Sequence, residues 1–307
     1  MTILTTNSTS AFYSRARSEM TALRKQTEQL QSQVGSQSRL SRSSDDPVAA
    51  SRLRALERED ALSQIDVTNA NRATADLNIA DTTLSSFTNA IGRARELALQ
   101  AANDTLTPDQ RASIGKALEG LHGTMVALAN TRDTNGNALF GGESAADAYT
   151  LDAAGNAVYS GTAASGSLPL GEGQTVSRSI TGPEFLNFQV EGVDTDLLAT
   201  IKTLADALTG GAANPTEAAR RSLDALSAGL DAVSTGQTLV GSRLAWIEMT
   251  SERRTNLGEL RASEQAEIGG ADLATSLAKL QEMLVVLQAS QATFTRLSQL
   301  SLFDQLR

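Results

Sequence analysis

The chain has 307 residues, a formal net charge of −9 and no cysteine. The acidic balance argues against nucleic acid and membrane surfaces as partners, and the missing thiols exclude disulfides, thiolate metal sites and a cysteine nucleophile. Aromatic residues make up only 4% of the chain, which favours long helices packed on small and unbranched side chains over a large globular enzyme core.

The first segment predicts a helix with a narrow apolar seam. Small or apolar residues recur at alternating steps of three and four, namely Tyr13, Ala16, Met20, Leu23, Thr27, Leu30 and Val34. Such heptad spacing is typical of a helix that packs along one partner helix. Charged and amide side chains fill the intervening positions, so this helix would be marginal in water by itself.

Three later signals predict where helices begin and end. Asp46 and Pro47 supply a cap acceptor followed by proline at the first helical position, and we expect a long helix from there to about residue 103. Thr107 and Pro108 begin a capping-box pattern for a third helix, which should pack back on the second. Asn135-Gly136 marks a tight turn at which the helical periodicity stops.

Residues 143–193 predict a small β-rich insertion, because they are rich in glycine, serine and threonine between turn signals. The candidate strands are 157–159, 176–180 and 188–190. Helical patterns return at 197–208, 216–234 and 239–268, and Gly269-Gly270 then interrupts the chain before its last segment.

The last segment has the most regular apolar seam of the sequence. Leucines and phenylalanines recur along one face of this segment. Each buried leucine contributes about 1.5–3 kcal/mol, and we therefore expect the two chain ends to stabilise each other as a helix pair. The predicted self-assembly seam comprises Met20, Leu23, Leu30, Val34, Leu273, Leu277, Leu280, Leu284, Leu287, Phe294, Leu297, Leu300 and Phe303.

These patterns predict a mainly α fold, in which a long helical hairpin or coiled coil built from the N- and C-terminal segments carries a small β-rich outer domain. We expect a terminal coiled-coil assembly domain from 1–45 with 270–307 and a long-helix bundle from 46–142 with 194–269. The outer insertion is expected at 143–193.

Candidate catalytic and metal-binding residues are few, and each has a plainer interpretation. His122 is the only histidine and has no nucleophile pattern around it. Asp133 begins a calcium-like loop, but glycine comes fourth rather than sixth and Ser144 stands at position twelve. Asp45 and Asp46 lie directly before Pro47, which favours helix capping over catalysis.

The sequence therefore predicts no catalytic residue, no metal site and no cofactor. The basic side chains near the N-terminus have no interleaved aromatic residues for base stacking, and we interpret them as solvated or inter-subunit charges. They are Arg15, Arg17, Arg24, Lys25, Arg39 and Arg42.

Four segments together resemble flagellar hook-filament junction proteins, the hook-associated proteins of the FlgL type, which are relatives of flagellin. They are the loop and helix start at 43–50, the helix end at 93–103, the turn at 130–142 and the C-terminal Ser298 to Asp304. Flagellin itself usually has Asp-Asp-Ala-Ala-Gly in the first of these segments and lacks the Leu-Phe-Asp ending, so the differences favour the junction proteins.

The resemblance implies a structural subunit that joins the hook-associated proteins to the flagellin filament through self-assembly of its terminal helices. Its implied partners are further copies of itself in a ring, the upstream hook-associated junction protein, flagellin, and a cytoplasmic export chaperone that binds the C-terminal helix. The implied location is the extracellular flagellum, reached by flagellar type III export, and residues 1–18 indeed lack the apolar core of a cleavable signal.

Two other functions remain open from the sequence. A minor flagellin of the filament would share the same organisation. A cytoplasmic coiled-coil signalling hairpin would instead have an uninterrupted helical tip, which the β-rich insertion argues against. An enzymatic activity would have to lie within the insertion.

Overall fold

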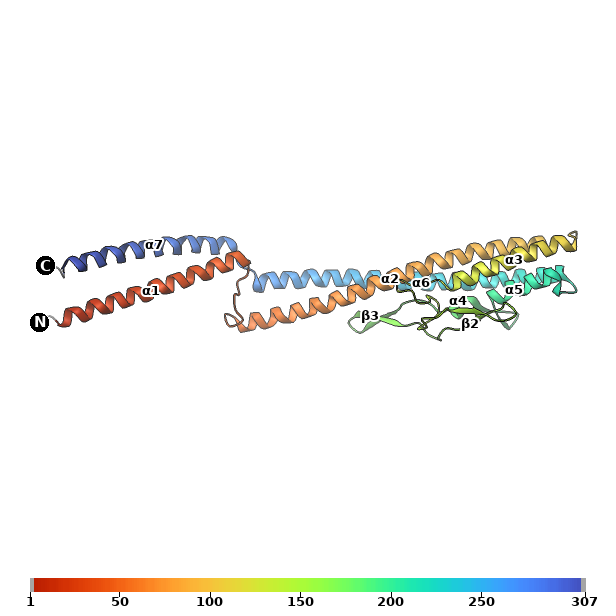
Figure 1. Ribbon diagram of the computed structural model, residues 1–307, viewed down its shortest axis with the longest axis horizontal. Coiled ribbons are helices and arrows are strands. Elements are labelled where there is room, and N and C mark those ends of the chain that lie inside the picture. Colours follow the sequence, from red (N-terminus) through yellow and green to blue (C-terminus); the bar gives the residue numbers. More distant parts are fainter. Residues whose placement is uncertain (1–2, 305–307) are drawn as a thin grey trace. The chain divides into compact units, whose positions relative to one another are not determined.

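The computed structural model describes residues 3–304, with side chains described for 11–210 and 212–296 (Figure 1). In this part of the chain the long helices are α1 (Ile3–Ser36), α2 (Pro47–Ala101), α3 (Pro108–Ala129), α6 (Pro215–Gly269) and α7 (Leu273–Asp304). Shorter helical segments are α4 (Gly182–Leu186), α5 (Leu197–Asp206) and the π-helical turn η1 (Ala207–Gly211). The predicted mainly α fold is confirmed, with paired terminal helices and a small β-rich insertion.

The chain forms two compact units. The first is built from the two ends of the chain, up to Ala61 and from Asn256 onward, and the second is Leu62–Thr255. The helices α2 and α6 contribute residues to both units. The three-part division into 1–45 with 270–307, 46–142 with 194–269, and 143–193 stays a prediction.

In the first unit, α1 and α7 lie side by side and run in opposite directions (Figure 1). Near the chain ends, the rings of Tyr13 and Phe294 meet edge to face with centroids 5.5 Å apart. At the other end of the pair, the backbone N–H of Arg39 donates to the Gly269 carbonyl at 2.8 Å, and that of Ala271 donates to the Gln37 carbonyl at 3.0 Å. These backbone hydrogen bonds join the segment that follows α1 to the segment that precedes α7.

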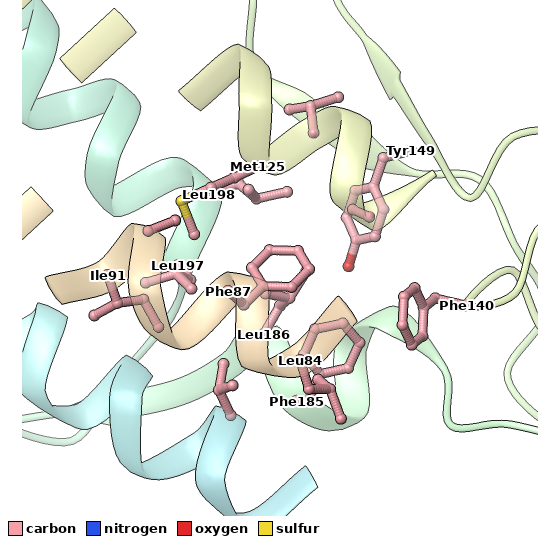
Figure 2. Packing of buried hydrophobic residues seen from close by; sticks show 14 of the residues in the cluster. Leu84, Phe87, Ile91, Met125, Phe140, Tyr149, Phe185, Leu186, Leu197 and Leu198 are labelled. Atoms are coloured by element: carbon pink, nitrogen blue, oxygen red, sulfur yellow. The ribbon is translucent and has the colours of Figure 1, made fainter. Parts of the chain in front are cut away.

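The core of the second unit is built on helices that bury one stripe each. Along α2, buried residues recur at heptad spacing from Ala70 to Ala101, and along α6 the buried positions Ala219, Leu226, Val233, Val240 and Ile247 follow steps of seven. Aromatic rings extend this core into the insertion. The ring centroid of Phe185 lies 5.4 Å from that of Phe87 and 4.9 Å from that of Phe140 (Figure 2).

The insertion contains three antiparallel hairpins, each an independent two-stranded sheet. They pair β1 (Tyr149–Leu151) with β2 (Ala157–Tyr159), β3 (Ser167–Gly171) with β4 (Gln174–Ser177), and β5 (Asn187–Val190) with β6 (Val193–Asp196). The candidate strands 157–159 and 188–190 fall within β2 and β5, whereas 176–180 overlaps only the end of β4. The expected strand therefore started after the beginning of β4 and extended past its end into the segment before α4.

One boundary expected from the sequence is wrong. The segments 216–234 and 239–268 were each expected to form a helix, but α6 runs through both without a break. Gly236 lies in the gap between them, and a Cβ at this position would come within 2.9 Å of the Phe185 Cβ. The glycine allows the insertion to approach a continuous helix, so it does not end one.

Candidate functional site

The N-terminal seam residues of α1 lie along the face that packs on α7. Met20, Leu23, Leu30 and Val34 are half-buried, and Thr27 between them is buried and donates its hydroxyl to the Leu23 carbonyl at 2.9 Å. The alternating spacing read from the sequence therefore corresponds to one face of this helix.

The predicted C-terminal seam divides into two rows on α7. The inner row is half-buried and faces α1, and it consists of Ser276, Leu280, Met283, Leu287, Ser290 and Phe294, at alternating steps of four and three. The outward row is exposed and consists of Leu273, Leu277 and Leu284, whereas the exposed Val285 and Val286 point in other directions because successive helical residues are about 100° apart. Of the predicted seam, Leu280, Leu287 and Phe294 belong to the inner row, while Leu273, Leu277 and Leu284 belong to the outward row.

Leu297, Leu300 and Phe303, the last members of the predicted seam, lie outside the described side chains. Met283 belongs to the inner row but was not part of the predicted seam. Its signal was present in the sequence, since it lies three residues after Leu280 and four before Leu287.

The outward row of α7 is an exposed apolar surface. No other helix of the described residues covers it. Leu277 is 45% exposed and Leu284 is 36% exposed. The row extends over about 16 Å of helix at ~1.5 Å per residue. Contiguous exposed apolar surface of this kind typically marks a protein-protein contact.

A groove between α1 and α7 lies on the other flank of the inner row, with a volume of about 370 Å³. Its walls include Phe12, Met20 and Leu23 of α1, and Val286 and Phe294 of α7. Phe12 remains 48% exposed. Two helices alone therefore leave this level of the seam incompletely packed, and additional apolar side chains would gain contact there.

The loop of residues 37–46 connects α1 to α2, and two aspartates hold its conformation. Asp46 Oδ1 accepts from the Ala49 N–H at 3.0 Å, and its Oδ2 accepts from Arg39 at 3.2 Å. Arg39 also donates from Nη2 to the Ile268 carbonyl at 3.0 Å, so one guanidinium connects the start of α2 to the end of α6. The N–H of Ala49, and then Arg39, lower the pKa of Asp46.

Asp45 has a different part in the same loop. Its Oδ2 accepts from the Arg42 N–H at 2.8 Å and from the Ser41 hydroxyl at 3.0 Å. The Arg42 N–H, followed by the Ser41 hydroxyl, lowers the pKa of this carboxyl group. Both aspartates are occupied in holding the loop, which gives them a structural explanation.

The other turn and cap residues begin or end helices in both units. Pro47, in the first unit, is the first residue of α2, and Pro108, in the second unit, is the first of α3. The Thr107 hydroxyl accepts from the Gln110 N–H at 3.3 Å, while the Gln110 side chain accepts from the Thr107 N–H at 2.9 Å. Asn135 and Gly136 form the exposed turn, with Gly136 at a φ of 84°.

A buried ionic cluster, which sequence reasoning missed, fixes the insertion to α2. Arg178 donates to the carboxylates of both Asp76 and Asp133, whose side chains are 0% and 5% exposed. Asp133 Oδ1 also accepts from the N–H groups of Asn135 and Asn137. Thr134 donates its N–H and its hydroxyl to Asp76.

The bonding of Asp133 fits the turn interpretation. Its carboxylate is already engaged by two backbone N–H groups and by Arg178, which leaves no free oxygen pair for a cation. Among the described side chains, 11–210 and 212–296, no grouping of acidic or histidine residues is suited to hold a metal ion. None of the described helices is both long and apolar enough to cross a bilayer.

Comparison with known proteins relates both the sequence and the fold to flagellar components. The family model for the bacterial flagellin N-terminal helical region matches residues 8–145. Flagellar hook-associated protein 3 of Escherichia coli K12 is 26% identical over 286 residues, covering 89% of this chain and 90% of that protein. The protein of the same name from Salmonella typhimurium LT2 is 33% identical over 135 residues, covering 44% and 43%.

Among solved structures, a putative flagellar hook-associated protein from Vibrio parahaemolyticus has the same fold. Its TM-score is 0.67 at 22% identity, and the match covers 74% of this chain and all of that structure, 100%. At this level of identity the similarity concerns the fold.

Proposed function

We propose that the terminal helix pair assembles this chain into the junction between the hook-associated proteins and the flagellin filament. Its sequence similarity to flagellar hook-associated protein 3, and the match of residues 8–145 to the flagellin N-terminal helical region, support this proposal. The protein is then a structural subunit of the extracellular bacterial flagellum. The observation that carries this proposal is the outward apolar row of α7, which the chain's own helices leave exposed.

The terminal pair has the surface that an assembling subunit needs. Its inner row joins α1 to α7, and its outward row and the groove on the other flank of the inner row offer apolar side chains to a neighbour. Burying three leucines of the outward row would contribute several kcal/mol at about 25 cal/mol per Å². We therefore propose Leu273, Leu277 and Leu284 as contacts between copies in a ring, with Met20, Leu23, Leu30, Val34, Leu280, Leu287 and Phe294 holding the pair itself.

Assembly at the growing tip follows from the same arrangement. A helix pair with an incompletely filled seam is stabilised when neighbouring subunits cover it. Amide hydrogen exchange around Leu23 and Leu284 is expected to be fast in the free protein and slow in the assembled flagellum. Equal protection in both states would contradict this coupling.

Further partners follow from the resemblance and are part of the proposal. The ring would contact the upstream hook-associated junction protein on one side and flagellin on the other. Export through the flagellar type III channel, with a cytoplasmic chaperone on the C-terminal helix, would keep the exposed row covered before assembly. We also propose that the protein has no catalytic activity, which is consistent with relatives whose names describe flagellar components.

Deletion of the gene tests the junction role. Electron microscopy is expected to show bare hooks, and flagellin is expected in the culture medium. Complementation with a Leu277→Asp, Leu284→Asp double variant should fail to restore filaments, whereas Val193→Asp, at a valine that is 66% exposed on β6, should restore them. Filament loss without any shed flagellin would identify a filament subunit instead, and normal filaments after deletion would contradict the proposal.

A further inference from the structure

The only histidine of the chain lies at a core position between two helices. Along α3 the buried positions Gly115, Leu118, His122, Met125 and Ala129 recur at steps of three and four. His122 is 4% exposed, and its Nε2 has no hydrogen-bond partner. An ionisable imidazole thus stands where heptad packing normally places an apolar side chain.

The helix α5 and the turn η1 form the other side of this seam. The approach is close, since a Cβ on Gly115 would lie 2.8 Å from the Thr209 methyl and 3.1 Å from the Leu208 Cβ. The segment is bounded by Asp196, which caps α5 through the Ala199 N–H at 2.8 Å, and by Gly210 at a φ of 127°. Asp196 and Gly210 thus mark the two ends of the segment that packs on α3.

The charges around His122 come from both helices. Glu119 lies on its own helix, and Asp196, Lys202 and Asp206 lie on the α5 side. The Lys202 ammonium donates to both carboxylate oxygens of Asp206 at 2.5 and 2.6 Å, which holds it in place. Burial, and then the Lys202 charge, lower the pKa of His122 against the opposing pull of the three carboxylates.

We propose that the contact between α3 and α5 is an acid-sensitive latch, in which protonation of His122 separates α5 and η1 from α3. Burying a cation whose Nε2 has no hydrogen-bond partner is unfavourable even beside these carboxylates, whereas water hydrates it once the helices part. The latch neither requires nor alters the junction role, because His122, α5 and η1 belong to the second unit and the terminal helix pair belongs to the first.

The sign of the effect follows from proton linkage. The separated state has an ordinary histidine with a pKa near ~6.5, and the closed state binds the proton less readily. The opening equilibrium therefore rises by up to about tenfold for each pH unit below ~6.5, until the pH reaches the lower pKa of the closed state. Above that window the imidazole is neutral and the latch stays closed.

Hydrogen exchange of the full chain, measured between pH 7.5 and 5.5 and corrected for intrinsic rates, tests the latch. Amides of 112–129 and 197–206 are expected to gain up to about fivefold in opening between pH 6.5 and 5.5, while those of 20–34 do not change. His122→Leu keeps the seam apolar and should abolish the gain. An equal gain in His122→Leu, or no gain in the wild-type chain, overturns the proposal.

A second measurement remains decisive if the leucine variant does not fold. Because the chain has one histidine, its imidazole gives a single NMR signal on selective labelling. A titration midpoint clearly below 6.5 in the folded protein supports the latch. A midpoint at or above 6.5 refutes it, since protonation would then cost the closed state nothing.

Discussion

Replacing Arg178 with methionine would leave two buried carboxylates without the cation they share. The Asp76 side chain is 0% exposed and that of Asp133 5% exposed, so neither gains much hydration in compensation. Removing one partner of a buried ion pair typically costs about 3–5 kcal/mol. The Arg178 side chain is itself 28% exposed, and we therefore expect a loss near the low end, about 3 kcal/mol.

Denaturation in urea, followed by the fluorescence of Trp246, measures this loss. Trp246 is the only tryptophan and lies in the same compact unit as the cluster. For a unit of this size, about 2–4 °C per kcal/mol predicts a drop of about 6–12 °C in the thermal midpoint. The dependence of the unfolding free energy on urea should keep its slope, because the unfolded surface does not change.

Arg253→Met is the matched control. Arg253 pairs with Glu172 at 2.5 Å, but these side chains are 61% and 53% exposed, so the expected loss is below about 1 kcal/mol. Changing Asp76 and Asp133 to asparagine in the Arg178→Met background should recover much of the stability, since the buried charges are gone. A loss below 1 kcal/mol for Arg178→Met, or equal losses for both arginines, would refute the reasoning.

Three further expectations concern single positions. Asp46→Ala should lower the thermal midpoint of the first unit, measured by circular dichroism, and Asp46→Asn should lower it less because asparagine still caps the helix; equal losses would contradict this. Gly236→Ala should lower the unfolding free energy by about 1–3 kcal/mol, because the added Cβ collides with Phe185. Gly241→Ala has open space around it and should raise the unfolding free energy by about 1 kcal/mol. Urea denaturation compares the two variants, and a less stable Gly241→Ala would contradict this expectation. Burial raises the pKa of Asp133, but the Asn137 N–H and other donors outweigh it and lower this pKa. The Asp133 carboxylate therefore stabilises the fold fully above about pH 3.9, and this stabilisation is lost as the pH falls through the lower pKa of the folded state. The difference in unfolding free energy between wild type and Asp133→Asn should shrink below pH 4, and a constant difference would contradict this explanation.

The helical part of the fold was predictable because its signals are local. The heptad steps of α1, the cap acceptor and proline at the start of α2, and the capping box of α3 depend on residues within one or two turns of each other. The unbroken run of α6 through Gly236 was not predicted, for the opposite reason. The role of this glycine depends on Phe185, which is far away in the sequence and reaches α6 only in the folded chain.

The assembly surface was predictable as a stripe but not as two rows. The sequence shows that α7 is rich in leucine at heptad spacing, yet periodicity does not say which of two adjacent rows faces α1. Only the half-burial of Leu280 and Met283, beside the exposure of Leu277 and Leu284, separates them. The ionic cluster was missed because its three charges come from α2, a turn and the insertion. The signal for it was Asp76, an acidic residue within the buried stripe of α2.

The accessibility of position 277 tests most directly whether the outward row of α7 is where copies meet. The chain has no cysteine, so Leu277→Cys introduces one thiol, and Val193→Cys provides an exposed control on β6. With a thiol-reactive reagent, we predict fast labelling of both variants in the free protein, and in intact flagella labelling of position 193 alone. Equal labelling of Leu277→Cys in the free and assembled states would contradict the proposed assembly surface.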